Sequence, residues 1–312
     1  MKYLVVCLTT LMSVGVYAQN ILNAKSPQEL REMRSEMYDI VNGGQDTIST
    51  APIPLPYGNI QDKDILWSRV VWEIIDLNEK LNQPYYYSHD EVTANYVSLY
   101  DALFNGINAG EITEVYDDDN FTSKVDPENL KSKIQAVRES DWLQDKRASG
   151  ETITEQDIME GTDHFKVDTK SVKLIKIKGM WYIDKRLGQM KYRLLGIAPM
   201  GPDPQVLGLN DAAALGYEGE DEMIDLFWVF YPGARDVLSR YTVFNPRNGS
   251  SSITYDDVLN ARRFSSIIYK SQSEYGDGEI SHYIPGDAKS QLEESNRIKN
   301  EILQKENNMW NY

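Results

Sequence analysis

The chain has 312 residues, of which 32 are basic and 48 are acidic, so its formal net charge is −16 at pH 7. A mean hydropathy of −0.50 and 41% of hydrophobic residues are typical of a soluble globular protein, and they exclude collagen-like, coiled-coil and disordered chains. The length is sufficient for one large domain or two small ones.

The first residues have the pattern of a secretory signal peptide. Lys2 precedes an apolar run, and small residues stand three and one positions before an expected cut after Ala18. The run is shorter than the roughly 20 residues that cross a bilayer, so a cleaved signal (residues 1–18) is favoured over an uncleaved anchor. The only cysteine, Cys7, lies inside it. Disulfides, thiol nucleophiles and cysteine-based metal sites are therefore excluded from residues 19–312.

A short helix and a proline-rich arm are expected over residues 19–60. A capping box at Ser26 predicts a helix over 26–41. Prolines at alternating positions follow within 42–59 and favour an extended path. This segment is either a surface linker or an arm laid on a neighbouring molecule. In the second case the apolar side chains make the contact, namely Ile53, Leu55 and Tyr57.

Residues 62–81 have the strongest helical periodicity of the chain. Their apolar residues fill about half of the circumference at 100° per residue, which predicts an amphipathic helix. Ile65 and Trp72 fall on the opposite side among charged residues. This pair indicates a helix that is covered on two sides, by its own chain or by another subunit. A second helix is predicted over 95–109, with Gly110 at its end.

The middle of the chain alternates polar and apolar residues, as antiparallel strands with one polar face do. We expect strands over 167–184, 191–198 and 223–231. Helices are predicted over 232–241, 255–270 and 287–310. These elements predict an α+β fold with a central, mostly antiparallel sheet flanked by helices, and with the extended proline-rich arm at its N-terminus. The body is expected over 61–312, undivided or as two sub-lobes, 61–202 and 203–312.

Charged residues are segregated along the chain. The segment 166–193 contains nine basic and two acidic residues, whereas 202–232 contains seven acidic residues and no lysine or arginine. Such a dipolar arrangement can bind an acidic partner or a second copy, and contacts between different faces propagate into rings or filaments. Alternatively, the lysines only solvate one face of a sheet and discourage edge pairing. The first interpretation assigns the contact to Lys173, Lys176 and Lys178.

Signals of catalysis are weak. The three histidines, His89, His164 and His282, have no metal-ligand spacing, and neither a nucleophile elbow nor a phosphate-binding loop is present in the sequence. The acidic turns at 117–120 and 276–279 do not follow the calcium-loop pattern. We therefore expect no enzyme, metal or cofactor, although paired carboxylates of a hydrolase leave little trace in a sequence. An acidic exported chain is also a poor partner for nucleic acid.

Two aromatic segments are long enough to be distinctive. They are PLPYGNIQDKDILWSRVVWEIIDLNEKLNQPYYY at 54–87 and FWVFYPGARDVLSRYTVFNPRN at 227–248. Both segments, and the C-terminal helix, resemble the GldN/PorN family of gliding-motility and type IX secretion proteins of Bacteroidetes. The resemblance covers most of the chain after the signal peptide.

The resemblance implies a non-catalytic structural subunit in the periplasm, associated with the outer membrane. It implies assembly with a GldK/PorK-like lipoprotein and with further copies of the chain in a ring, and contact with the periplasmic domain of a GldM/PorM-like motor protein. The family provides no catalytic residue to carry over. Two other classes remain as alternatives: an exported carboxylate-dependent hydrolase, and a monomeric glycan-binding module with an aromatic row formed by Tyr85–Tyr87 and Trp181.

Overall fold

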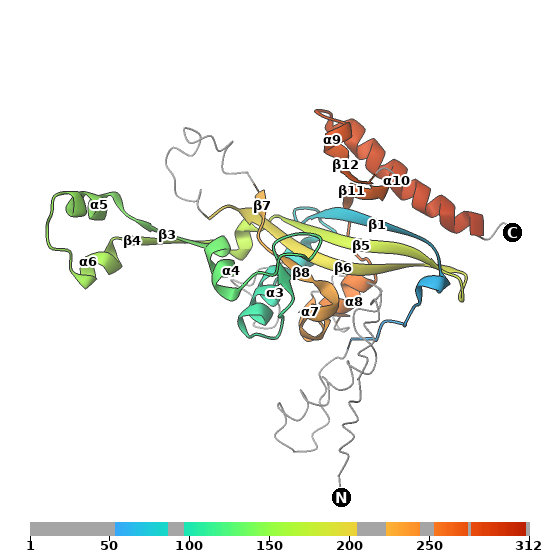
Figure 1. Cartoon of the computed structure of the whole chain (residues 1–312), viewed down its shortest axis with the longest axis horizontal. Coiled ribbons are helices and arrows are strands. Elements are labelled where there is room, and N and C mark those ends of the chain that lie inside the picture. The colour runs from blue at the N-terminus through green and yellow to red at the C-terminus, as the bar shows by residue number, and fades with distance from the viewer. Residues whose placement is uncertain (1–53, 87–96, 205–222, 244–252, 274–275, 310–312) are drawn as a thin grey trace, which may run out of the picture.

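The computed structural model describes residues 54–86, 97–204, 223–243, 253–273 and 276–309 (Figure 1). Its centre is an antiparallel eight-stranded sheet with the order β12-β11-β1-β5-β6-β8-β2, in which β7 also pairs with β6. The long strands are β1 (Ile65–Asp76), β5 (Leu174–Asp184), β6 (Gln189–Pro202) and β11 (Ile267–Ser273). The short ones are β2 (Val115–Tyr116), β7 (Met223–Asp225), β8 (Trp228–Phe230) and β12 (Gly276–Glu279). The predicted α+β fold with a central antiparallel sheet is confirmed.

Helices pack on two parts of this sheet. The main core lies between strands β5 and β6 and the helices α3 (Leu99–Asn108), α7 (Tyr231–Leu238) and α8 (Tyr255–Asn260). A second cluster joins β1 and β11 to α9 (Ile280–Tyr283) and α10 (Ala288–Met309). The remaining elements of the body are η2 (Asp62–Asp64), α2 (Gln83–Tyr86), η3 (Thr169–Ser171), β9 (Thr242–Val243) and β10 (Ile253–Thr254). None of the helices that the structure describes combines the length and apolar composition that a bilayer crossing requires.

The prediction of a helix over 62–81 is wrong, because these residues form strand β1. The strand has 12 residues and pairs with β5 on one side and with β11 on the other. Val70, Val71 and Trp72 are consecutive and all buried, since both faces of the strand are covered. A strand that is buried on both faces lacks the alternation of a half-exposed one, and its apolar run imitates a helical period. The β-branched and aromatic side chains then favour the strand.

Three of the predicted helices are confirmed with shifted ends. α3 begins after Ser98, whose hydroxyl accepts a hydrogen bond from the Asp101 amide, and Gly110 follows it with a positive φ of 74°. A glycine adopts this conformation without the steric cost that other residues pay. α7 corresponds to the helix predicted over 232–241, and α10 to the helix predicted over 287–310.

The helix predicted over 255–270 is wrong beyond Asn260. α8 ends there, Arg262 adopts a positive φ of 49°, and the chain then enters β11. The strand predicted over 223–231 is divided into β7 and β8, which pair with different parts of β6. The signal peptide and the helix predicted over 26–41 lie outside the described residues, as does most of the arm.

A long extension of the body was not predicted from the sequence. It follows α4 (Pro127–Ile134), which packs in the main core, and consists of β3 (Gln135–Glu139), α5 (Asp141–Ala148), α6 (Glu155–Glu160) and β4 (Thr162–Lys166). β3 and β4 form a separate two-stranded ribbon, and α5 and α6 lie at its outer end (Figure 1). We call residues 135–166 the projection. Its elements have only five to eight residues each, too few for a clear periodicity.

Candidate interaction site

The described end of the arm is fastened to the body through Tyr57 and the two residues that follow it. Ile53 lies outside the described residues, and Leu55 is 78% exposed. Tyr57, in contrast, is half-buried, and its hydroxyl donates a hydrogen bond of 2.7 Å to Oδ1 of Asn260 on α8. The guanidinium of Arg193 lies 4.5 Å and that of Arg235 lies 4.0 Å from the centre of the Tyr57 ring. Two cation–π contacts and one hydrogen bond therefore hold Tyr57. Arg193 and Arg186 donate further hydrogen bonds to the carbonyl oxygens of the next two residues, at 3.0 and 2.9 Å.

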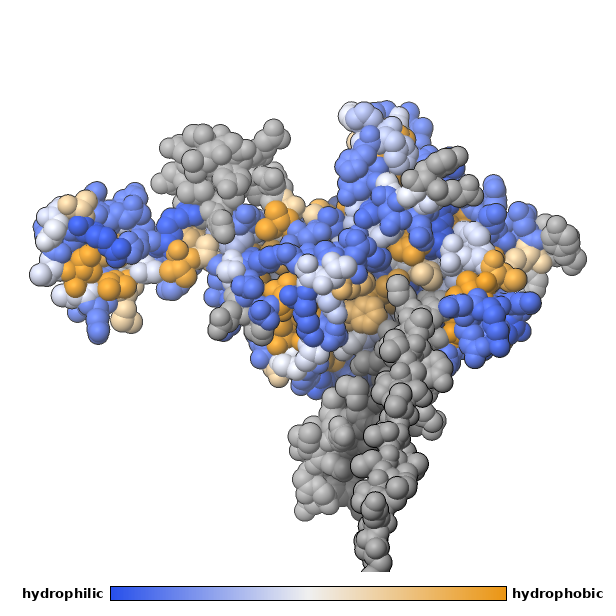
Figure 2. Space-filling model, in the orientation of Figure 1, coloured by the Kyte–Doolittle hydropathy of each residue, from blue (hydrophilic) through white to orange (hydrophobic). Residues whose placement is uncertain are grey.

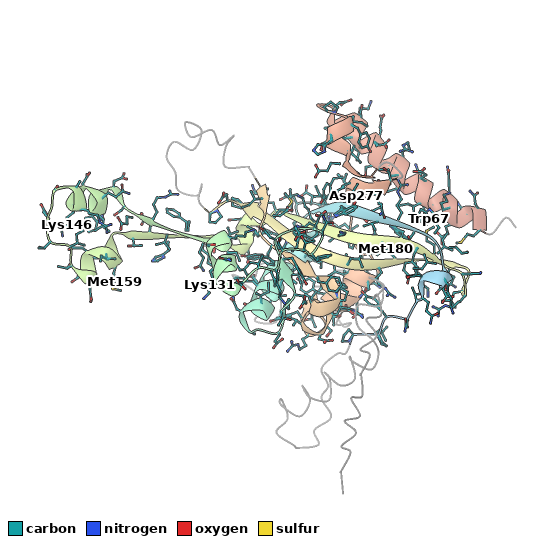
Figure 3. All side chains as sticks on the ribbon, viewed as in Figure 1. Trp67, Lys131, Lys146, Met159, Met180 and Asp277 are labelled. Carbon is teal, nitrogen blue, oxygen red and sulfur yellow. The ribbon has the colours of Figure 1, made fainter. Side chains whose placement is uncertain are left out.

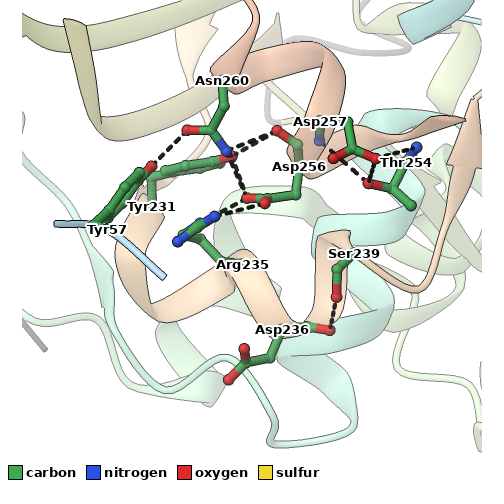
Figure 4. Close-up of polar contacts among 9 residues, drawn as sticks. All are labelled: Tyr57, Tyr231, Arg235, Asp236, Ser239, Thr254, Asp256, Asp257 and Asn260. Carbon is green, nitrogen blue, oxygen red and sulfur yellow. Dashed lines mark hydrogen bonds and ion pairs between the residues drawn. The ribbon is translucent and has the colours of Figure 1, made fainter. Parts of the chain in front are cut away.

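Behind Tyr57 lies a buried ion pair between helices α7 and α8 (Figure 4). Arg235 donates from Nε and Nη2 to the two carboxylate oxygens of Asp256, at 2.8 and 2.7 Å. Tyr231 donates to the same carboxylate at 2.7 Å, and the Asn260 amide donates to it at 2.9 Å. The Asp256 carboxylate thus accepts four hydrogen bonds, which offset the cost of burying its charge.

The local sequence explains how this ion pair is assembled. Tyr231 and Arg235 are four residues apart on α7, as are Asp256 and Asn260 on α8, so each pair shares one face of its helix. A capping box between Thr254 and Asp257 fixes the start of α8 and thereby the position of Asp256. The two helices therefore present complementary polar faces inside an otherwise apolar core.

The pKa directions agree with this geometry. Burial raises the pKa of Tyr57 well above its usual value, so its hydroxyl remains a hydrogen-bond donor. Burial alone would lower the pKa of Arg235, but the hydrogen-bonded carboxylate of Asp256 outweighs this effect and the pKa is raised. The positive charge that faces the Tyr57 ring is consequently permanent over the accessible pH range.

We expect Tyr57→Phe to reduce the free energy of unfolding by about 1 kcal/mol, because it removes the hydrogen bond to Asn260 and keeps the ring between the two arginines. Tyr57→Ala removes both contacts and should also accelerate proteolytic cleavage within 54–59. Urea unfolding and limited proteolysis measure the two effects. Leu55→Ala is the matched control and should change neither. Unchanged cleavage in Tyr57→Ala would show that the anchor does not hold the arm.

The predicted basic strands meet acidic groups of the same chain. Lys178 of β5 and Lys270 of β11 are the register partners of Trp72, and their ammonium groups lie 4.7 and 4.4 Å from the centre of its buried ring. Lys178 donates to the carbonyl oxygen of Asp119 at 2.7 Å, while Lys270 forms an ion pair with the Asp119 carboxylate at 2.8 Å. Burial lowers the pKa of Lys178, and the Asp119 charge opposes this. The acidic turn is thereby fastened over the sheet.

The other predicted lysines differ in exposure. Lys176 forms an ion pair of 2.8 Å with Asp225, which belongs to the acidic segment 202–232, whereas Lys173 is exposed. Oppositely charged segments of the sequence therefore neutralise each other in part within one molecule. The assignment of these lysines to a partner stays a prediction, and Lys173 is the most exposed of the three.

The remaining predicted contact residues lie in separate places. Ile65, at the start of β1, packs with Ile60 and Tyr182, whereas Trp72 belongs to another cluster with Trp228. Tyr85 is buried in the main core, so it does not contribute to an exposed aromatic row. Trp72 is thus covered by its own chain, one of the two possibilities that the sequence left open.

A second buried ion pair was missed by sequence analysis. Glu73 of β1 accepts two hydrogen bonds from Arg262, at 2.9 and 2.8 Å, and a third from Ser266. The Arg262 guanidinium also lies 4.1 Å from the centre of the Tyr192 ring. A carboxylate inside the apolar run WSRVVWEIID and an arginine inside FYPGARDVL are the signals that could have indicated these ion pairs, because charge in a buried segment needs a partner.

The buried carboxylates form ion pairs that hold elements of the fold together. Within the described ranges, no three His, Cys, Asp or Glu side chains are grouped so that they could hold a metal ion. His164 and His282 are exposed, and His89 lies outside the described residues. Three buried carboxylates of the described residues, Glu73, Asp184 and Asp256, each face an arginine. Their geometry is that of ion pairs that position a strand and two helices.

Comparison with known proteins finds one family. A family model described as "Gliding motility associated protein GldN" matches residues 60–311. The match begins directly after the segment that carries Tyr57, and it includes both buried ion pairs, the sheet and the projection. No curated protein matches the chain.

Proposed function

This chain belongs to the GldN family of gliding motility associated proteins, and we propose that it is a non-catalytic structural subunit of the type IX secretion and gliding-motility machinery. In this proposal it assembles with a GldK/PorK-like lipoprotein into a ring in the periplasm, associated with the outer membrane through that lipoprotein. The family match over residues 60–311 is the observation that carries the proposal.

Three features of the molecule support a structural role. The signal-peptide pattern of residues 1–18 is that of an exported protein. Buried ion pairs join α7 to α8 behind Tyr57 and join β1 to Arg262. The projection exposes apolar side chains, which on a soluble protein mark surfaces for other proteins. The periplasmic domain of a GldM/PorM-like motor protein is a further partner in this proposal.

The mass of the complex tests this function. The mature chain, starting at Gln19, is mixed with the purified lipoprotein, and light scattering gives the particle mass of the mixture. The masses of the two separate proteins are measured in the same way. We expect a co-eluting particle that is larger than either component. If the two proteins elute separately at every concentration, the proposed function is wrong.

We expect Lys173→Glu to weaken lipoprotein binding by up to about fivefold, the effect of losing one exposed ion pair. The change should leave the unfolding midpoint as it is, because the side chain is exposed. Surface-based binding measurements give the affinity, and Lys289→Glu on α10 is a control at another exposed lysine. Equal affinities of both variants and the unchanged protein would mean that the basic strands only solvate a face of the sheet.

A further inference from the structure

The projection is a folded element that stands apart from the body (Figure 1). Five register pairs join β3 and β4, from Gln135 opposite Lys166 to Glu139 opposite Thr162. At the outer end Leu143 is fully buried, and Gly161 lies close against it. Ion pairs between Lys146 and Asp157, and between Arg147 and Glu139, fasten α5 to the neighbouring elements. These contacts give the tip a defined surface.

That surface is apolar and acidic. Trp142 and Ile158 are almost half exposed, and Met159 is 81% exposed. Figure 2 shows hydrophobic residues gathered on the tip and along the ribbon, and Figure 3 shows Met159 at the outer end, far from Met180 on the sheet. Segment 141–160 has two basic and six acidic residues. Both bases are engaged in the ion pairs just described, and five of the acids are exposed: Asp141, Asp145, Glu151, Glu155 and Glu160.

A surface of the opposite charge and similar hydrophobicity lies at the other end of the sheet. Leu66 is the extra residue of a bulge in β1 and is 61% exposed, and Leu187 in the β5–β6 turn is 53% exposed. The Lys185 amide donates to the Asp64 carbonyl oxygen at 2.7 Å, which brings η2 and this turn together. The same elements and the start of β6 carry four basic residues: Lys63, Lys185 and Arg186 are exposed, and Lys191 is half-exposed.

The acids at this end cancel only part of that charge, since four basic residues stand against the three acids Asp62, Asp64 and Asp184. Asp184 is buried and accepts hydrogen bonds from Arg186, and the carboxylate of Asp64 is largely buried beside the same arginine. Asp62 is the one exposed acid of η2. The outer surface of this end, which we call the basic end, therefore combines exposed lysines with two exposed leucines.

The two surfaces cannot meet within one molecule. The projection joins the sheet through η3, just before β5 begins at Leu174, and the basic end lies where β5 ends at Asp184. Eleven residues of strand span about 35 Å. Figure 1 shows the projection and the β5–β6 turn at opposite ends of the longest axis. Surfaces that complement each other but lie at opposite ends of a molecule fit two successive copies.

We propose that the tip of the projection docks onto the basic end of a second copy of this chain. Trp142, Ile158 and Met159 then cover Leu66 and Leu187, and the exposed acids of the tip face the lysines of the basic end. The contact joins different surfaces, so it is heterologous and leaves one tip and one basic end free for further copies. This docking proposal rests on the proposed function in one respect: it names the contact through which successive subunits of the proposed ring bind each other.

The test uses two complementary variants of the mature chain. The tip variant carries Ile158→Asp and Met159→Asp, and the end variant carries Lys185→Glu and Leu187→Asp. All four side chains are exposed, so we expect folded proteins with unchanged thermal unfolding. Sedimentation should show that the unchanged chain associates beyond the dimer with rising concentration, and that each variant alone stays monomeric.

Mixing the two variants provides the decisive measurement. The end variant keeps an intact tip and the tip variant keeps an intact basic end, so an equimolar mixture should form dimers of twice the monomer mass and nothing larger. Leu292→Asp with Leu303→Asp, at exposed leucines on α10, is the control and should associate like the unchanged chain. A monomeric unchanged chain, variants that associate normally, or a mixture that stays monomeric would each overturn the proposal.

Lipoprotein binding, measured in parallel, separates the two proposals. If both variants still bind the lipoprotein but form no large particle with it, docking between copies is supported together with the proposed function. If the variants form the same large particles as the unchanged chain, the docking proposal fails and the proposed function stands. If no form of the chain binds the lipoprotein, the proposed function fails, and the mixing result alone decides on docking.

Discussion

Asp256→Ala is expected to lower the free energy of unfolding by about 3–5 kcal/mol, the cost of removing one partner from a buried ion pair. The change leaves the Arg235 guanidinium charged inside the core, and it also removes the acceptor of the Tyr231 and Asn260 hydrogen bonds. Urea unfolding followed by circular dichroism measures this loss.

An exposed ion pair of the same protein provides the control. Glu293 on α10 lies 3.9 Å from Lys289, and both side chains are largely exposed. Glu293→Ala should change the free energy of unfolding by no more than about 0.5 kcal/mol, because water screens this pair. The double variant Arg235→Met with Asp256→Leu removes both charges and should recover much of the stability that Asp256→Ala loses. A loss in Asp256→Ala no larger than in Glu293→Ala would contradict the role of this ion pair.

Trp72→Ala should destabilise the protein by about 3–5 kcal/mol, as large-to-small changes of buried aromatic residues do. Trp72 is almost fully buried in the centre of the sheet, where its ring faces the ammonium groups of both Lys178 and Lys270. The variant therefore creates a cavity and leaves two neighbouring cations without the ring between them. Denaturant unfolding gives the size of the loss.

Trp142→Ala is the matched control for this prediction, since Trp142 is partly exposed at the tip of the projection. We expect its stability to stay within about 1 kcal/mol of the unchanged chain. The pair of variants thus separates a tryptophan that holds the sheet from one that is available for contact. Equal losses in both variants would mean that the burial of Trp72 does not hold the sheet together.

The sequence predicts an element correctly when the element is long and one of its faces is exposed. α10 has 22 residues with buried Ile298 and Ile302 on one side and charged residues on the other, so its period is visible in the sequence. β1 is rich in apolar residues, but its middle is covered on both faces and loses the alternation that identifies a strand. The error concerns a strand with four consecutive buried residues, Val70 to Glu73, and such a run contains neither a helical nor a strand period.

The sequence predicted the surroundings of the candidate contact residues only in part. The sequence identified Tyr57 and Trp72 as residues that need a partner, and the structure supplies both partners from the same chain. It could not indicate that Asp119 lies over Lys178 and Lys270, because these residues are far apart along the chain. Sequence distance carries no information on which charges meet after folding.

By itself, the sequence determined the family, the acidic net charge, the absence of cysteine after residue 18 and the α+β class, because composition and long motifs do not depend on neighbours in space. Only the tertiary structure decided that residues 65–76 form a strand, that the segregated charges pair in part within one molecule, and that a ribbon carries Met159 to the outer end of the projection. Each of these depends on contacts between residues far apart in the chain, and a local pattern of side chains does not contain them.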